Sequence, residues 1–352
     1  MTYSNDTALV IDTNLTHVLV EEYALPKWIT YILIGLHLVI VGISLIGNGI
    51  ILIYFLLVKR GKTNANYYLV ALAMSDLLLV IWCEPFTVFN NLINYHWLFG
   101  KFMCYSVSFM QTASVIQRSC TLVASSVDRY IAIRWPLRKQ ASLLVVIAII
   151  TAIWFFSLIL SVPVAIFTDI KLYNELDNSS GICIEDWPQN GLRQAYSSSL
   201  FIVTYCIPLL VLIITYGHIV LILDVKPPGE EYGNLMRRRR IVKRKTIKVF
   251  LLAFFAYALC WLPIHTITIV GDINPLIYDS KLVHVVWLFA QCLAVSTSAI
   301  NPMIVLGSER MARTVGRRTS SERRSGNPFR KGSFNLLKSR MNKRRSTQET
   351  WQ

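Results

Sequence analysis

Three polar residues, Gln111, Arg118 and Arg129, follow one another at intervals of 7 and 11 positions in a long apolar stretch. Their amide and guanidinium groups can form hydrogen bonds and charge pairs. At roughly 100° per residue, the three side chains fall within about 20° of one another on a helix. A charge at the centre of a bilayer costs at least about 2.5–3.5 kcal/mol, so Arg118 must face protein or water. The stretch Cys104–Tyr130 is therefore predicted to be the central helix of a bundle, with a polar seam along one side.

The elements that must position this helix are long apolar segments. The chain has 352 residues, of which 54% are hydrophobic and 16% charged; this excludes a disordered protein and is unusual for a soluble one. Each apolar segment exceeds the roughly 20 residues that cross a bilayer. The seven segments are residues 29–58, 66–95, 102–133, 142–168, 197–223, 247–271 and 282–306. We predict an all-α membrane protein, a seven-transmembrane helix bundle, because no soluble domain of this size has seven such helices.

The basic residues predict how the bundle is oriented. Lysines and arginines concentrate in segments 59–65, 134–140 and 225–248, while the opposite side carries few cations and several acids. The positive-inside rule then places the N-terminus outside and the C-terminus in the cytoplasm. Residues 1–28 are expected to be an extracellular arm, and residues 307–352 a basic cytoplasmic tail that is mostly disordered.

Cysteines and glycosylation sequons agree with this orientation. Five of the seven cysteines lie inside predicted spans, and Cys104 and Cys183 lie at the outer face, where disulfides persist. We expect these two cysteines to form one bridge. Three Asn-x-Ser/Thr sequons, at Asn5, Asn14 and Asn178, are predicted on the same outer side and are expected to be glycosylated.

The cytoplasmic segments predict contacts with partners and lipid. The loop 225–248 starts with a Pro-Pro-Gly turn and continues into a basic run, which suits an inward extension of the sixth helix. Such an extension would offer a basic face to a protein or to anionic membrane lipid. A short membrane-parallel amphipathic helix is expected near 308–315, and serines and threonines after basic pairs in the tail suit phosphorylation.

Motifs distributed in order over about residues 30–310 resemble those of rhodopsin-like (class A) G-protein-coupled receptors. These motifs are Gly47-Asn48, Asp76, Trp97-Leu98-Phe99-Gly100, Asp128-Arg129-Tyr130, Trp154, Pro208 with Tyr216, Cys260-Trp261-Leu262-Pro263 and Asn301-Pro302. The resemblance implies a multi-pass plasma-membrane receptor that is not an enzyme and needs no cofactor or metal. It implies a heterotrimeric G protein as partner, arrestin and kinases at the tail, and no nucleic acid.

The resemblance also implies a conformational switch. Asp128 and Arg129 would form a charge pair at the cytoplasmic end, and a swing of the sixth helix about Pro263 would free Arg129 to meet the G protein. Trp261 would lie under the ligand and convert contact above it into helix motion. Agonist would shift the populations of two states by binding one of them better. The expected switch residues are Asp76, Arg118, Asp128, Arg129, Tyr130, Tyr216, Trp261, Pro263, Asn301 and Pro302.

A closer likeness is to the neuropeptide Y group, and within it to the luqin and RYamide receptors, through SVDRYIAIRWPLRKQ and KPPGEE. It implies a short extracellular peptide that ends in Arg-aromatic-amide. Gln111 would contact the terminal amide and Asp272 the ligand arginine, although Asp272 could instead be an ordinary solvated loop acid. An amine ligand is disfavoured, since position 111 carries no carboxylate. The expected ligand-binding residues are Thr87, Gln111, Thr268, Asp272, Gln291 and Trp261.

Arg118 departs from the family pattern. It stands where a small hydroxyl residue usually helps Asp76 to hold a sodium ion. We hypothesise that the Arg118 guanidinium replaces that ion and pairs with Asp76. Glu84 is a second possible partner, because helix rise alone does not decide which acid lies level with Arg118. In a third possibility, Arg118 reaches a water-filled pocket and pairs with nothing.

Three other positions depart from the pattern. Val305 replaces the tyrosine expected in Asn-Pro-x-x-Tyr and predicts signalling below ordinary efficiency; low G-protein output, altered basal activity and a non-signalling isoform stay open. Tyr257 stands where phenylalanine is usual, and Ser119 stands where an aliphatic residue usually packs between Pro208 and the sixth helix.

Rival classes make predictions that the sequence does not meet. A light-driven protein needs a lysine in the last span for its retinal, and residues 282–306 contain none. A secondary transporter would show related halves, and no internal repeat is visible. A receptor of the same fold for another peptide, a small molecule or a lipid stays open.

Overall fold

The computed structural model describes residues 25–57, 63–94, 96–135, 138–172, 181–224 and 234–324. For residues 172, 222–224, 234–250, 279 and 308–324 it describes the backbone only. The chain divides into two compact units, Met1–Val305 and Leu306–Gln352, and the bundle below belongs to the first. The predicted glycosylation sites Asn5, Asn14 and Asn178 lie outside the described residues and stay predictions.

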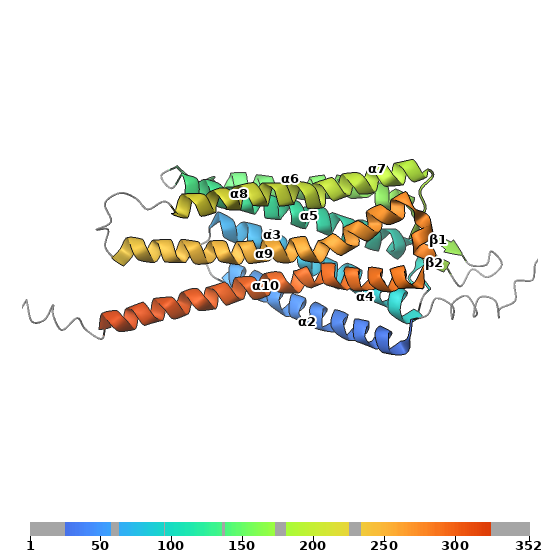
Figure 1. Cartoon of the computed structure of the whole chain (residues 1–352), viewed down its shortest axis with the longest axis horizontal. Coiled ribbons are helices and arrows are strands. Elements are labelled where there is room, and N and C mark those ends of the chain that lie inside the picture. The colour runs from blue at the N-terminus through green and yellow to red at the C-terminus, as the bar shows by residue number, and fades with distance from the viewer. Residues whose placement is uncertain are drawn as a thin grey trace, which may run out of the picture. The chain divides into compact units, whose positions relative to one another are not determined.

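In each of the seven predicted spans, the described residues are helical, except for one residue at either end of the span 142–168. The elements are α2 (Lys27–Leu57), α3 (Asn64–Leu78), η1 (Leu79–Cys83), α4 (Glu84–Val88), η2 (Phe89–Asn94), α5 (Gly100–Arg134), α6 (Leu143–Phe167), β1 (Thr168–Leu172), β2 (Gly181–Glu185), α7 (Asn190–Phe201), η3 (Ile202–Cys206), α8 (Ile207–Asp224), α9 (Asn234–Ile273), η4 (Pro275–Asp279) and α10 (Lys281–Arg324). The helices of the first unit run side by side along one direction, and β1 and β2 lie at one end (Figure 1).

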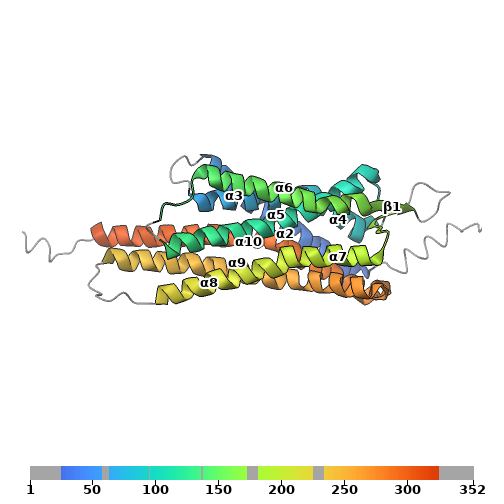
Figure 2. The same ribbon diagram turned by 90° about the horizontal axis from the view of Figure 1, so that it is seen from above.

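Helix α5 is the centre of the bundle, as its polar seam predicts. It contacts α3, α6, α8 and β1, and the two views place it among the other helices (Figure 2). None of Gln111, Arg118 and Arg129 is exposed, and Arg118 is 2% exposed. The seam therefore faces protein.

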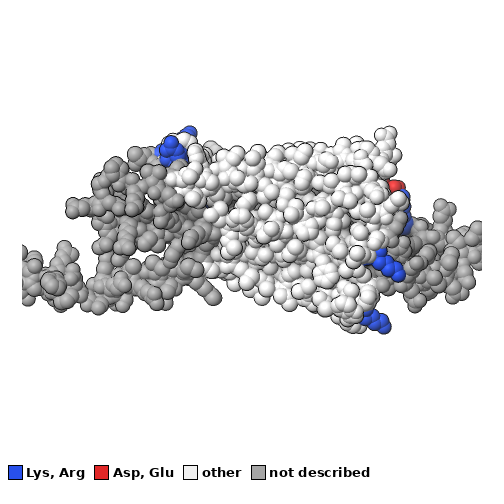
Figure 3. Space-filling model, in the orientation of Figure 1, with Lys and Arg blue, Asp and Glu red and all other residues white. Residues whose placement is uncertain are grey.

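The outside of the bundle suits lipid. Among the described residues, six helical segments are long and apolar enough to cross a membrane. Helix α5 has the length, at 35 residues, but its polar seam makes it less apolar than the others. Figure 3 shows a broad face free of charged side chains, with lysines, arginines and an acid towards its ends. An α-helix forms its backbone hydrogen bonds internally, which a bilayer requires because its core offers no water to bind free N–H and C=O groups.

Prolines account for local breaks in the helices. Proline has no N–H and its ring clashes with the carbonyl four residues earlier, so an α-helical hydrogen bond is lost there. The π-helical turn η1 ends two residues before Pro85, and η3 ends two residues before Pro208. These wider turns accommodate the missing donor.

Three helix ends differ from the predicted spans. The fifth span begins at Asn190 rather than 197, because its first turns are polar and carry no hydrophobic signal. Helix α9 begins at Asn234, in agreement with the expected inward extension of the sixth helix. Instead of a separate short helix near 308–315, α10 continues to Arg324; the sequence has no proline between Pro302 and Pro328 to interrupt it. Residues 325–352 lie outside the described residues.

Candidate functional site

Arg118 and Asp76 form a buried ion pair between α5 and α3. Nη1 of Arg118 donates to Oδ1 of Asp76, and the two side chains are 3% and 1% exposed. The amide of Asn301 lies beside the same carboxylate without completing a hydrogen bond. Asp76 is the first of the two partners considered from the sequence. The arrangement does not fit a sodium ion, because the guanidinium already occupies the cation position on the carboxylate.

Glu84, the other acid considered for Arg118, faces His37 instead. Its Oε2 lies 3.8 Å from Nε2 of His37, and both side chains are buried. Nδ1 of His37 lies 2.9 Å from the carbonyl of Leu33, an acceptor, so Nδ1 carries a proton. No hydrogen bond joins Nε2 and Glu84 at this distance; the two groups can face one another as an imidazolium and a carboxylate, or as a neutral imidazole and a neutral carboxyl group. In both forms the pair needs one proton to avoid an unpaired buried charge.

The Gly47-Asn48 motif of α2 packs on the Asn301-Pro302 motif of α10. A Cβ at position 47 would lie 2.6 Å from Cβ of Pro302, so only glycine permits this approach. Pro302 deprives the carbonyl of Ser298 of its usual i+4 donor. Nδ2 of Asn48 donates to that carbonyl at 3.0 Å. The two motifs form one unit, in which the amide compensates for the proline.

The same logic explains Tyr257 and Ser119. Pro208 removes the i+4 donor for the carbonyl of Thr204, and the Tyr257 hydroxyl donates to this carbonyl. Because the tyrosine proton is used there, Oγ of Ser119 donates to the Tyr257 oxygen, at 2.7 Å. All three residues are buried. A hydrogen-bonded contact thus links α5, η3 and α9 where the family usually has apolar packing.

The cytoplasmic half brings the expected switch residues near one another. Oδ1 of Asp128 accepts from the Asn64 amide at 3.3 Å. Arg129 lies within electrostatic reach of Asp128 and of the buried Tyr216. The hydroxyl of Tyr130 forms a 2.8 Å hydrogen bond with Nδ1 of His218, and the two rings stack. This end of α5 is thereby joined to α3 and α8.

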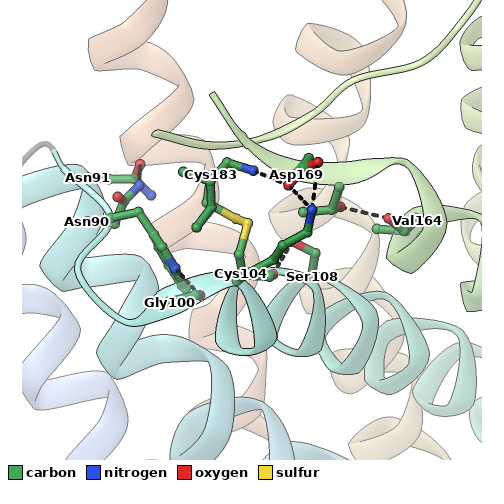
Figure 4. Close-up of a disulfide and its surroundings, with 12 residues drawn as sticks. Asn90, Asn91, Gly100, Cys104, Ser108, Val164, Asp169 and Cys183 are labelled. Atoms are coloured by element: carbon green, nitrogen blue, oxygen red, sulfur yellow. Dashed lines mark hydrogen bonds and ion pairs between the residues drawn. A yellow bond between two sulfur atoms is a disulfide. The ribbon is translucent and has the colours of Figure 1, made fainter. Parts of the chain in front are cut away.

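The outer end is tied together by the predicted disulfide. Cys104 of α5 bonds to Cys183 of β2, which confirms that prediction (Figure 4). Strands β1 and β2 are antiparallel, with Ile170 opposite Cys183. Lys101 hydrogen-bonds to Asp169 at 3.0 Å, and this bond lowers the pKa of the exposed Asp169 carboxyl.

A positive φ lets the chain turn into α5 at the same end. Gly100 has φ 75°, a conformation that glycine adopts readily. Its carbonyl accepts a 2.8 Å hydrogen bond from the Trp97 indole, whose ring packs against Phe86 and Phe99. The Trp-Leu-Phe-Gly motif therefore forms the turn before α5 that positions Cys104 next to Cys183.

The expected ligand-binding residues come from four elements. Thr87 of α4 donates to the carbonyl of Cys83 in η1, and Thr268 of α9 donates to a carbonyl of its own helix. Gln111 of α5 is half-buried, and Gln291 of α10 is buried. Among the described side chains, no hydrogen bond joins these four to one another. The Trp261 indole lies deeper in α9 and donates to Thr297 at 3.3 Å.

Asp272, the expected acid of the ligand site, is buried rather than solvated. It is 6% exposed at the end of α9, and its Oδ1 lies 2.9 Å from Nε of Arg193 in α7. The neighbouring Gln194 amide donates to the Asp272 main-chain carbonyl at 2.5 Å. The ordinary loop-acid interpretation is therefore wrong.

Sequence reasoning missed Arg193 and His37 and did not connect Tyr257 with Ser119. A basic residue just before the fifth apolar segment and a histidine inside the first were visible signals. The link between Tyr257 and Ser119 could have been suspected, because two unusual polar residues occur at positions that the family brings together. Their partner, a main-chain carbonyl, has no signature in the residue type.

Known proteins are similar in sequence to most of this chain. The profile of the 7 transmembrane receptor (rhodopsin family) matches residues 47–304. The RYamide receptor of Drosophila melanogaster is 32% identical over 280 residues, which are 76% of this chain and 59% of the relative. Neuropeptide receptor 22 of Caenorhabditis elegans is 33% identical over 278 residues, 73% and 62% respectively. The substance-P receptor of Rattus norvegicus is 27% identical over 293 residues, 81% and 69% respectively. The chain spans less than two thirds of the length of the first two relatives.

Proposed function

Because the chain belongs to the rhodopsin family of seven-transmembrane receptors, we propose that it is a G-protein-coupled receptor for an extracellular neuropeptide. The chain is a multi-pass protein of the plasma membrane, and its family consists of receptors rather than enzymes. The proposed ligand is a short, C-terminally amidated peptide with an arginine next to a terminal aromatic residue. The name of one relative, an RYamide receptor, supports this ligand class, and the name of a second, a neuropeptide receptor, supports a neuropeptide ligand in general.

One observation carries the proposed ligand chemistry, the buried carboxylate of Asp272 at the outer end of α9. An acid that is 6% exposed favours a cationic partner, and a guanidinium matches a carboxylate with two parallel donors. The proposal assigns the terminal amide of the peptide to Gln111, whose own amide can both donate and accept. Thr87, Thr268, Gln291 and Trp261 would complete the site on α4, α9 and α10.

The proposed output is a shift between two conformations. Peptide bound between the outer ends of the helices would press on Trp261, whose ring lies 5.9 Å from that of Tyr257. Movement of α9 about Pro263 would then separate the cytoplasmic ends and expose Arg129 to a heterotrimeric G protein. The ligand shifts this equilibrium by as much as its affinities for the two states differ. Arrestin and kinases at the basic tail, and anionic lipid at its membrane side, are further proposed partners.

Val305 favours a second candidate, a receptor with weak or altered G-protein output. The family's tyrosine at this position supplies a hydroxyl near Tyr216 in the active state, and valine has none. The two candidates share the fold and the ligand site and differ in signalling efficiency.

A peptide panel tests the proposal. Cells expressing the full chain would be exposed to amidated neuropeptides, with calcium and cyclic AMP both recorded. Peptides ending in Arg-aromatic-amide should elicit a signal from the cells. Their free-acid and citrulline analogues should be at least about tenfold less potent, as expected for loss of one strong polar contact. A chain that reaches the cell surface but binds no such peptide would refute the ligand class. Tight binding without calcium or cyclic AMP signals would favour the weakly signalling candidate.

A further inference from the structure

Asp272 already has a guanidinium partner within the chain. Nε of Arg193 lies 2.9 Å from Oδ1 of Asp272. The aspartate side chain is 4% exposed, whereas the arginine side chain is 35% exposed. The pair thus joins a fixed, buried acid to a cation that reaches it from the solvent side.

The contact leaves the hydrogen-bonding capacity of the carboxylate unused. Neither Oδ1 nor Oδ2 of Asp272 has a hydrogen bond of good geometry among the described residues. Arg193 therefore supplies charge through one edge of its guanidinium, without the two parallel N–H···O bonds that make such pairs strong. A guanidinium that approached both oxygens would be a better partner than the resident one.

The acid is held in place by contacts that do not involve Arg193. The Gln194 side chain binds the main-chain carbonyl of Asp272 at 2.5 Å. The next residue inward, Gly271, lies so close to the Tyr278 ring that an added Cβ would come within 2.3 Å of it. Departure of the Arg193 side chain would therefore leave the main chain at Asp272 in place.

We infer that the Asp272 carboxylate is a guanidinium subsite that Arg193 fills in the absence of ligand, and that an incoming guanidinium displaces Arg193 from it. The inference rests on the proposed function and adds a residue that sets its selectivity. With Arg193 in place, the binding free energy that the ligand gains at Asp272 is only the difference between its own guanidinium contact and the Arg193 contact that it replaces. Without Arg193, the ligand would neutralise an otherwise unpaired buried charge, so discrimination for arginine should rise.

The first test uses a small probe and no peptide. The full chain in lipid nanodiscs is titrated with ethylguanidinium and, separately, with ethylammonium, while its melting temperature is recorded. Arg193→Ala should show a saturable rise with ethylguanidinium that exceeds the rise with ethylammonium. The rise should be absent from the Arg193→Ala/Asp272→Asn double variant. If Arg193→Ala does not reach the membrane, Arg193→Gln is titrated in the same way.

A matched control separates this site from general ion effects. Lys101→Ala removes another outer-face cation from an acid, Asp169, but that pair is exposed, at 65% and 49%. Ethylguanidinium should leave the melting temperature of this variant unchanged. An equal response of the Lys101 and Arg193 variants would overturn the inference.

The second test uses peptide. The affinity ratio of an Arg-aromatic-amide peptide to its citrulline analogue should rise about tenfold in Arg193→Ala. A fall in this ratio would overturn the inference, because Arg193 would then assist the ligand. If no peptide binds but ethylguanidinium still stabilises Arg193→Ala, the subsite is supported and the proposed peptide class fails.

Discussion

The hydroxyl of Tyr257 donates its hydrogen bond to the main-chain carbonyl of Thr204, four residues before Pro208. Proline causes a local defect in a helix, and here a side chain from another helix supplies the missing donor. Asn48 does the same for the carbonyl of Ser298, which Pro302 deprives of its donor. In both places, the carbonyl that a proline leaves without its donor accepts a hydrogen bond from a side chain of a neighbouring helix.

Replacing Tyr257 by phenylalanine should lower the free energy of unfolding by about 1–2 kcal/mol, because the buried carbonyl loses its side-chain donor. Ser119→Ala should cost less, since the bond from Tyr257 to Thr204 survives. Thermal unfolding of the purified chain in nanodiscs measures both. A Phe variant as stable as the original would show that the carbonyl does not need the hydroxyl.

Gly47→Ala should destabilise the bundle by about 1–3 kcal/mol, as expected for overpacking. The added methyl group would overlap Pro302, with 2.6 Å between the two Cβ atoms. Gly49→Ala is the matched control two residues away, because nothing lies within 4 Å of its added Cβ. There the better helix propensity of alanine should leave stability equal or higher. Equal losses in both variants would contradict the close approach of α2 and α10.

Loss of one member of the Arg118–Asp76 pair should cost about 3–5 kcal/mol, because the other charge would remain buried without a partner. Arg118→Asp and Asp76→Arg should each reduce surface expression and thermal stability. Combining them should recover part of the loss, since a pair of opposite charges is restored. A double variant no better than the worse single one would argue against direct pairing.

The same pair predicts that sodium does not affect ligand affinity in the unmutated protein. The guanidinium occupies the cation position on Asp76, which leaves no site for a removable ion. Binding isotherms measured with sodium chloride and with choline chloride at equal ionic strength should coincide. A decrease of agonist affinity with sodium would count directly against this arrangement.

Cys104→Ser should lower the free energy of unfolding by about 2–5 kcal/mol, the usual effect of removing a native disulfide. The bridge spans 79 residues and fixes β2 to the start of α5. Mild reductant should reproduce the effect. Cys120→Ala, which removes a free cysteine and keeps the bridge, serves as control: its stability should change little and should still fall with reductant, whereas Cys104→Ser should be insensitive to reductant. An unchanged melting temperature in Cys104→Ser would show that packing of the hairpin suffices.

The sequence alone determined the seven helices, their orientation, the central position of α5 and the disulfide. A bilayer enforces long apolar helices and a one-sided charge distribution, so these features are local and can be read from composition and period. The prediction that Arg118 faces away from lipid followed from the cost of placing a charge in the bilayer. Where the first turns of a helix are polar, as at Asn190, they carry no apolar signal, and the predicted helix start lies several residues too far along the chain.

Tertiary structure decided which groups are partners. Asp76 and Glu84 were both possible for Arg118 because the axial offset of two packed helices depends on their tilt and on the π-helical turn between the two acids. The partners of Tyr257 and Asn48 are main-chain carbonyls, which every residue has and which become available only beside a proline. Arg193 reaches Asp272 from 79 residues away in the chain, a distance that only the folded bundle closes.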